Sequence, residues 1–474
     1  MINFDDREQV VLAIDFGKTT TKLALLYLET EKGIEYISDS GSNYSSSIEI
    51  SKNNGEVSVL GDSKAPKNQH SLVFSSIYDF IDTEDTWKVD NFNWNKIDFL
   101  AAALEEIKDF ILTKISNIKI IRTIICIDFA TTMKYKKYFK RAAEVAGLKA
   151  VEVFSHPIAV FKHLKNEVTN GKYLHLDYGH STLNIYQVIL QNQIVTIDQA
   201  KVYKTDQIDI DKELYEYLHQ LILKQSSQNF SIESVSEEGK NSLKENIDKI
   251  KKDFKRRPSS EINVRNYGEV IGFKSIVFYK DIKHLFEAKY NQILTRVKEI
   301  AKDNSINAIV CSGGAIDQEL IEFLDNNLEL KLIYNIDKTK WLATLGCLDL
   351  GLDRGNYVIS EKYNLILSDQ SHFEVIKRYT PIDKIDELVY LSLVEDAAYA
   401  QIVIESNGNR EVIKVPSYGF LQETIVLELF IDQDYKLTIK AGSDKLPMEK
   451  RIEKKYDNIK MSYNYEIDGD QNGE

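Results

Sequence analysis

One pattern occurs twice in this sequence: an apolar strand, an aspartate at its end, a glycine two residues later, hydroxyl side chains and a second apolar strand. The first copy has the letters DFGKTTTK from Asp15 to Lys22, and the second has DYGHST from Asp177 to Thr182. A short polar loop between two apolar runs is typical of a strand-turn-strand unit. Helical patterns follow each copy, so the sequence predicts two similar α/β halves that face a cleft.

Both loops carry groups suited to phosphate. Glycine lets the backbone turn tightly and approach a ligand, and successive amides and hydroxyls can contact phosphate oxygens. Asp15 and Asp177 could each hold Mg²⁺, most readily through water, because Mg²⁺ keeps its hydration shell. Either loop alone could be an ordinary polar hairpin, and their recurrence favours a phosphate clamp. The predicted phosphate-binding residues are Gly17, Lys18, Thr19, Thr20, Lys22, Gly179, His180, Ser181 and Thr182.

Other segments predict the remaining architecture. Apolar spacing predicts helices at 96–116 and 134–146, strands at 120–129 and 150–154, and a helix that opens at Pro157. A further strand ends at Gly313 and Gly314, where the backbone can approach a base or sugar, although a lone glycine pair is a weak signal. After about residue 355 alternating strands predominate, and the last roughly 30 residues are expected to fray.

Composition narrows the class of protein. The 474 residues are 43% hydrophobic, which supports large cores and two or three domains. The formal net charge of -13 disfavours nucleic acid and anionic membranes as partners, since both are polyanions. The three cysteines, Cys126, Cys311 and Cys347, match no metal-ligand spacing and are expected to be reduced thiols. No signal peptide or membrane-length apolar run is present, so we expect a cytoplasmic protein.

The order of these motifs resembles the superfamily of actin, sugar kinases and heat-shock chaperones. Further segments resemble the DnaK-type, seventy-kilodalton heat-shock chaperones over nearly the whole chain. They are Lys134–Gly147 with the segment after it, Glu237–Val264, Thr339–Gly346, Leu365–Asp369, Tyr379–Ile382 and Phe420–Ala441.

This resemblance implies a fold and a ligand. The fold is a two-lobed, actin-like (ribonuclease-H-like) α/β nucleotide-binding domain at 1–364, an interdomain linker at 365–379, and a truncated β-sandwich at 380–474 with a frayed end and no helical lid. The ligand is ATP or ADP with Mg²⁺. The implied residues are Asp248, Lys251, Lys255, Gly313 and Gly314 around adenosine, Asp15 and Asp177 near the metal, and Asp177 and His156 as catalytic groups.

The chain also departs from the family's pattern. Ile77 stands where the family has a catalytic lysine, and His156 replaces the glutamate that helps position water. Lys18, Asn184 and Asp128 stand at other altered positions. Phosphoryl transfer depends on positioning and electrostatics, so these changes predict absent or weak hydrolysis with retained binding. Lys18 or Lys22 could replace the missing lysine, and His156 could orient water.

Three functions therefore remain open from the sequence. The first is an ATP-binding, chaperone-like regulator that acts on a protein partner, either a co-chaperone or a client. The second is a slow but genuine ATPase chaperone. The third is a scaffold or actin-like structural protein that no longer binds nucleotide. The sequence gives no oligomeric state.

Overall fold

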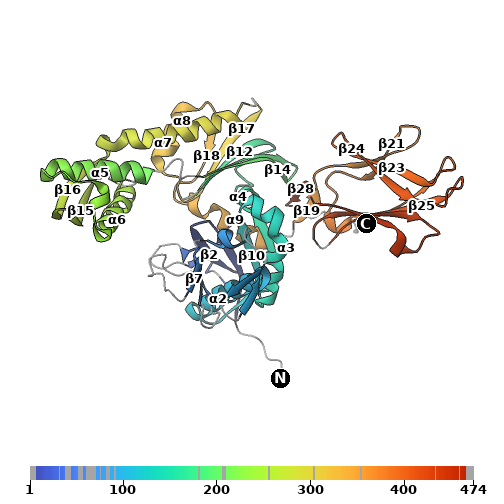
Figure 1. Cartoon of the computed structure of the whole chain (residues 1–474), viewed down its shortest axis with the longest axis horizontal. Coiled ribbons are helices and arrows are strands. Elements are labelled where there is room, and N and C mark those ends of the chain that lie inside the picture. The colour runs from blue at the N-terminus through green and yellow to red at the C-terminus, as the bar shows by residue number, and fades with distance from the viewer. Residues whose placement is uncertain are drawn as a thin grey trace, which may run out of the picture. The chain divides into compact units, whose positions relative to one another are not determined.

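The computed structural model shows a mixed α/β chain that divides into two compact units (Figure 1). Unit 1 comprises Met1–Gly171, Val188–Asp198 and Ala343–Glu474, and unit 2 comprises Lys172–Gln187 and Gln199–Leu342. The structure describes residues 7–30, 32–37, 44–51, 57–59, 71–74, 76–81, 86–89, 92–179, 182–204, 210–254, 257–302, 305–352, 355–432, 434–457 and 459–465.

The first sheet lies in unit 1. It contains, in order, β11 (Val151–Ser155), β10 (Ile118–Ile127), β1 (Glu8–Phe16), β2 (Thr20–Tyr27) and β3 (Ile34–Ile37), with β4 (Tyr44–Ser45) also paired to β2. β10 is parallel to both β1 and β11, whereas β1 and β2 form an antiparallel hairpin. The apolar run from Ile124 to Ile127 is completely buried, as expected of a central strand covered on both faces.

A second sheet repeats this strand order. It contains, in order, β18 (Lys331–Ile333), β17 (Ile306–Ser312), β12 (Gly171–Tyr178), β13 (Thr182–Gln191), β14 (Ile194–Lys204), β28 (Met461–Asn464) and β19 (Asn356–Ile359). β17 is parallel to both β12 and β18, as β10 is to β1 and β11. The division of the chain into units passes through β13 and β14. The predicted recurrence of the strand-turn-strand element is confirmed.

The predicted helices and strands of unit 1 are confirmed to within a few residues. The helices are α1 (Ile77–Ile81), α2 (Lys96–Lys114), α3 (Phe129–Val145), α4 (His156–His163) and α9 (Leu342–Leu352). The Asn95 side chain caps α2 by accepting a hydrogen bond from the amide of Asp98. Gly147 follows α3 with a φ of 76°, the left-handed conformation typical of a helix carboxyl end. Apolar faces of α2 and α3 share one core with the sheet.

Two of these helices pack with almost no space between their backbones. A Cβ atom on Gly346 of α9 would collide with the carbonyl oxygen of Ala159 in α4. Because α4 begins at His156 and α9 contains Thr344, this close packing fixes both side chains relative to the end of β1.

Unit 2 adds a helical region to its part of the second sheet. Its elements are α5 (Ile210–Ser226), α6 (Glu237–Asp253), β15 (Ser259–Tyr267), β16 (Val270–Phe278), α7 (Tyr279–Ile300) and α8 (Gln318–Asn327). The β15–β16 hairpin lies beside α5 and α6 (Figure 1). The side chain of Asn246 in α6 holds the hairpin by two hydrogen bonds: it donates to the backbone carbonyl of Asn263 and accepts from the backbone amide of Asn263. A single apolar core joins these elements.

The carboxyl-terminal part of unit 1 contains two four-stranded antiparallel sheets that share one apolar core. The sheet orders are β21-β20-β23-β24 and β22-β25-β26-β27. The strands are β20 (Tyr363–Ile366), β21 (His372–Ile376), β22 (Asp386–Ser392), β23 (Tyr399–Ser406), β24 (Asn409–Pro416), β25 (Thr424–Ile431), β26 (Leu437–Ser443) and β27 (Ile452–Tyr456). The turn at Asn407 and Gly408 has positive φ at both residues, as a tight hairpin requires. Small sheets are formed by β5 (Ile48–Ser51), β6 (Val57–Val59) and β7 (Ser71–Phe74), and by β8 (Thr86–Val89) and β9 (Phe92–Asn95).

Two sequence expectations differ from this structure. Residues 365–379, expected to be a linker, contain the end of β20 and all of β21, because Leu365 is buried in the shared core. The expected frayed end is wrong as far as residue 465, since β27 and β28 are paired strands. Tyr463 and Tyr465 are buried, and their burial offsets the entropic cost of ordering a charged tail. Residues 466–474 lie outside the described part.

Across the described ranges, the helices are all too short or too polar to cross a lipid bilayer.

Candidate functional site

The first candidate site, in unit 1, is centred on Asp15 at the end of β1. In the strand register Asp15 lies opposite Lys22 of β2 on one side and Cys126 of β10 on the other. Directly opposed residues project from the same face of a sheet, so these three side chains form a row. On β11, Phe154 lies opposite Cys126, and His156 follows two residues later as the first residue of α4.

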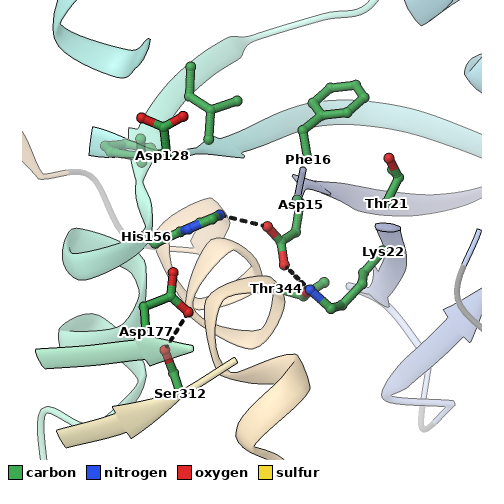
Figure 2. A network of polar contacts seen from close by, with 12 residues as sticks. Asp15, Phe16, Thr21, Lys22, Asp128, His156, Asp177, Ser312 and Thr344 are labelled. Carbon is green, nitrogen blue, oxygen red and sulfur yellow. Dashed lines mark hydrogen bonds and ion pairs between the residues drawn. The ribbon is translucent and has the colours of Figure 1, made fainter. Parts of the chain in front are cut away.

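The Asp15 carboxylate has polar partners on both oxygens (Figure 2). Oδ1 lies 2.9 Å from Nε2 of His156, and Oδ2 accepts a 2.8 Å hydrogen bond from the ammonium of Lys22. The hydroxyl of Thr344 also donates to Oδ2, at 3.4 Å. Burial opposes ionisation of Asp15, but the charges and hydrogen bonds of Lys22 and His156 outweigh it and hold the pKa of Asp15 well below its usual range.

Cys126 completes this group. Its thiol is fully buried, and burial together with a hydrogen bond to Cys347 raises its pKa well above the usual range. The ligand-type atoms of Asp15, Cys126 and His156 all lie within 4.8 Å of one another.

The altered position Ile77 is a core residue of α1 and is completely buried. Its neighbour Tyr78 donates a hydrogen bond to the carbonyl of Phe16 and accepts one from the amide of Asp128. Tyr78 therefore holds the backbone that follows Asp15. The buried aliphatic side chain of Ile77 supplies no charge at the altered position.

The loop after Asp15 is a tight turn held from one side. The amide of Gly17 donates to the carbonyl of Thr20, and a Cβ atom on Gly17 would lie only 2.6 Å from that oxygen. Ser46 donates to the carbonyl of Gly17, and its amide donates to the carbonyl of Thr19. Thr19 is exposed at the tip and Lys18 is half-buried. Of the predicted phosphate-binding residues in this loop, Lys22 is instead paired with Asp15.

The second candidate site, in unit 2, is centred on Asp177 at the end of β12. Asp177 lies opposite Ser312 of β17, whose hydroxyl donates to Oδ1 of Asp177 at 3.1 Å (Figure 2). The same hydroxyl lies 2.8 Å from Nε2 of His175, which is completely buried. Because Ser312 gives its only proton to Asp177, His175 must donate to Ser312 through Nε2. A relay of two hydrogen bonds therefore orients the Asp177 carboxylate.

The turn after Asp177 repeats the turn after Asp15. The amide of Gly179 donates to the carbonyl of Thr182 at 2.9 Å, as the amide of Gly17 does to the carbonyl of Thr20 at 3.1 Å. Each acid precedes its glycine by two residues and lies opposite a residue of a parallel strand. His180 and Ser181, predicted to contact phosphate, lie outside the described residues.

Gly313 is explained by packing within unit 2. It adopts a φ of 110°, and a Cβ atom there would collide with the backbone of Tyr178. Its amide donates to the carbonyl of Thr339, and the amide of Ala315 donates to the carbonyl of Tyr178. These contacts hold the segment after β17 against the end of β12. Gly314 is exposed and has open space around its Cβ position.

We therefore expect Gly313→Ala to destabilise unit 2 by at least about 2 kcal/mol, because the substitution forces both backbone strain and a collision. Gly314→Ala is the matched control and should change stability by no more than about 1 kcal/mol. Urea unfolding of the two variants beside the wild type measures this difference. Equal effects would mean that the segment adopts another conformation.

The predicted adenosine-contacting residues of α6 have other partners within unit 2. Lys251 donates to both carboxylate oxygens of Asp211 in α5, at 2.8 and 2.9 Å, and lies 3.1 Å from Asp248. Burial opposes the charge of Lys251, yet these two acids raise its pKa. Lys255 lies outside the described residues. This part of α6 thus presents a charged network that links it to α5.

Sequence reasoning missed four residues of these sites: Cys126, Thr344, Ser312 and His175. Cys126 and Ser312 each end a strand that is parallel to the acid-bearing strand, which is a signal that strand pairing alone would have given. Thr344 reaches Asp15 only through the packing of α9. His175 lies two residues before Asp177 on β12 and contacts Ser312 of the neighbouring strand.

A search of protein-family models and a search of curated proteins find no match to this chain.

Proposed function

We propose that the chain is a nucleotide-binding protein with an actin-like, two-lobed fold, and that it binds ATP with Mg²⁺ as a chaperone-like regulator of a protein partner. The observation that carries this proposal is the repeated acid-glycine turn at the end of β1 and of β12. The shared strand order of the two sheets supports it, because a duplicated α/β topology is what the resemblance implies. The two four-stranded carboxyl-terminal sheets, which share one apolar core, support the chaperone-like part of the proposal.

The residues present fit a phosphate ligand at the two turns. Thr19 is exposed at the first turn, Lys18 lies beside it, and Gly179 begins the second turn. These amides, the hydroxyl and the ammonium would neutralise and orient phosphate oxygens. The bound metal would supply charge neutralisation to the phosphates. Asp177, which is half-buried and oriented by Ser312, is better suited to hold its hydration shell than Asp15, whose oxygens contact Lys22 and His156.

Weak or absent hydrolysis follows from the same side chains. Ile77 is a core residue without a charge, and Nε2 of His156 contacts the Asp15 carboxylate. Lys22, the other candidate for charge stabilisation, is also paired with Asp15. Each missing electrostatic contact costs about 3 kcal/mol of transition-state stabilisation. Binding depends mainly on backbone groups, so it is expected to persist.

The test is a melting curve with and without Mg²⁺-ATP, followed by phosphate release from the same samples. Ligand at about 100 times its Kd stabilises a protein by about 2.7 kcal/mol, which raises the Tm by several degrees. We expect this rise in the wild type with little phosphate. Asp177→Asn should abolish it, while Asp281→Asn, an exposed acid of α7 in the same unit, should leave it unchanged.

A wild-type Tm that does not move at saturating Mg²⁺-ATP would overturn the nucleotide proposal and favour a scaffold. A Tm rise accompanied by steady phosphate release would retain binding and replace the regulator with a slow ATPase.

A further inference from the structure

The row of side chains at the end of β1 has a feature that nucleotide binding does not require. Three different ligand-type atoms, a carboxylate oxygen of Asp15, the thiol sulfur of Cys126 and a ring nitrogen of His156, lie within 4.8 Å of one another. They come from the ends of β1 and β10 and from the first residue of α4. Strand register places Asp15 and Cys126 side by side. His156 follows directly after the end of β11, the strand that pairs with β10.

The spacing suits direct coordination. Oδ1 of Asp15 and Nε2 of His156 are 2.9 Å apart. Two ligand atoms that each lie about 2.0–2.1 Å from a tetrahedral metal are about 3.3–3.4 Å apart, so these two atoms would separate by a few tenths of an ångström on binding. In the metal-free protein a hydrogen bond between these atoms holds them together, and a metal ion would take the place of its proton.

The chemistry of the donors selects the metal. One sulfur, one nitrogen and one oxygen ligand suit Zn²⁺, whereas Mg²⁺ prefers oxygen ligands and keeps its waters. Asp15, Cys126 and His156 supply three protein ligands, and a water molecule would complete a tetrahedral site. Asp15 and Cys126 are almost completely buried, so protein atoms would surround most of the metal ion.

The surrounding charges are compatible with a divalent ion. The thiolate of Cys126 and the carboxylate of Asp15 balance two positive charges once Cys126 loses its proton on binding. Lys22 contacts Oδ2 of Asp15, while Oδ1 is the oxygen that faces His156. The carboxylate can therefore bind metal through Oδ1 and keep Lys22 on Oδ2, a common outer-shell arrangement that orients a ligand.

We propose that Asp15, Cys126 and His156 bind a single Zn²⁺ ion through one oxygen, one sulfur and one nitrogen ligand. This inference goes beyond the proposed function, because the site lies wholly within unit 1 and binding is measured without nucleotide. Zn²⁺ here would join α4 to β1 and β10 and fix His156 in place.

The test uses Co²⁺ as a spectroscopic probe, added to the purified, chelator-treated full-length protein without nucleotide. Tetrahedral Co²⁺ bound to a thiolate gives visible bands and an ultraviolet charge-transfer band. We expect these bands to saturate at one Co²⁺ per chain and to disappear when Zn²⁺ displaces it. Cys126→Ser removes the thiolate ligand and should abolish the charge-transfer band. His156→Gln should weaken binding at least about 10-fold, because even the loss of an outer-shell partner typically has that effect.

Cys311→Ser is the matched control, because Cys311 is an equally buried free cysteine on β17 of unit 2. Cys311→Ser should leave the visible and charge-transfer bands of bound Co²⁺ unchanged, and the ratio should stay at one Co²⁺ per chain. A second measurement on the wild-type chain needs no variant: Zn²⁺ should slow alkylation of Cys126 in mild urea, read by peptide mass, and leave Cys311 unprotected. Absence of a charge-transfer band, or equal alkylation of Cys126 with and without Zn²⁺, would overturn the proposal whatever the nucleotide experiment shows.

Discussion

Replacing Tyr463 with alanine is expected to lower the free energy of unfolding of unit 1 by about 3–5 kcal/mol. Tyr463 belongs to β28, which pairs with β14 and with β19. Its ring is 1% exposed and meets the rings of Phe154 and Tyr357 edge-to-face, with centroids 5.0 and 5.1 Å apart. Removing the ring loses buried apolar area and two aromatic contacts, and it leaves a cavity beside β11.

Equilibrium unfolding in urea, followed by circular dichroism, measures this effect. Tyr418→Ala is the control, because Tyr418 is 59% exposed in the same unit and its loss should change stability by no more than about 0.5 kcal/mol. If Tyr463→Ala were as mild as this control, β28 would not be an integral strand of the sheet.

Lys22→Met is the second large effect that we expect, at about 3–5 kcal/mol near neutral pH. Methionine removes the ammonium that lies 2.8 Å from Oδ2 of Asp15 and leaves a carboxylate that is 1% exposed without its main counter-charge. A buried charge that loses its partner is more costly than the pair was favourable.

The loss of stability caused by Lys22→Met should be larger at neutral pH than in acid. The pKa of Asp15 is lowered in the folded protein, so its ionisation stabilises the fold above the unfolded pKa of about 3.9. This contribution disappears as the pH falls below about 4 toward the folded pKa. In Lys22→Met the folded pKa of Asp15 rises, so Asp15 is already protonated in mild acid. The difference between wild type and variant should therefore be largest near pH 7 and shrink on acidification.

A surface pair in the same unit provides the control. Lys32 and Glu8 lie 2.6 Å apart, but the Lys32 side chain is 56% exposed. Lys32→Met should cost no more than about 1 kcal/mol, because water screens this pair. Urea titrations of both variants at several pH values separate the two cases. A penalty for Lys22→Met that is constant with pH would contradict the assignment to the charge of Asp15.

Much of the fold could be predicted from local sequence. The apolar run before Asp15, the glycine two residues later and the return strand indicated the first hairpin, and the same letters around Asp177 indicated the second. Helix α2 followed from the spacing of Leu100, Leu104 and Ile107, which are all buried. These predictions succeed because alternation, helical periodicity and turn residues act within a few residues of the chain.

The end of the chain shows where local reasoning fails. A segment rich in Lys, Glu and Asp predicted fraying, yet β28 inserts between two strands that lie far from it in sequence. Nothing local distinguishes Tyr463 from a tyrosine in an exposed tail. Likewise the cysteine spacing matched no metal-ligand pattern, whereas strand register placed Cys126 beside Asp15.

The sequence by itself determined the two hairpins, the acid at the end of each first strand and the glycine that each turn requires, since these depend on backbone conformation over a few residues. Only the tertiary structure decided which groups meet those acids. Lys22, which the sequence assigned to phosphate, pairs with Asp15 across the hairpin. His156, Cys126 and Thr344 reach Asp15, and Ser312 reaches Asp177, from strands and helices more than a hundred residues away along the chain. Such contacts depend on parallel pairing and on the close packing of helices, for which no short stretch of sequence carries the information.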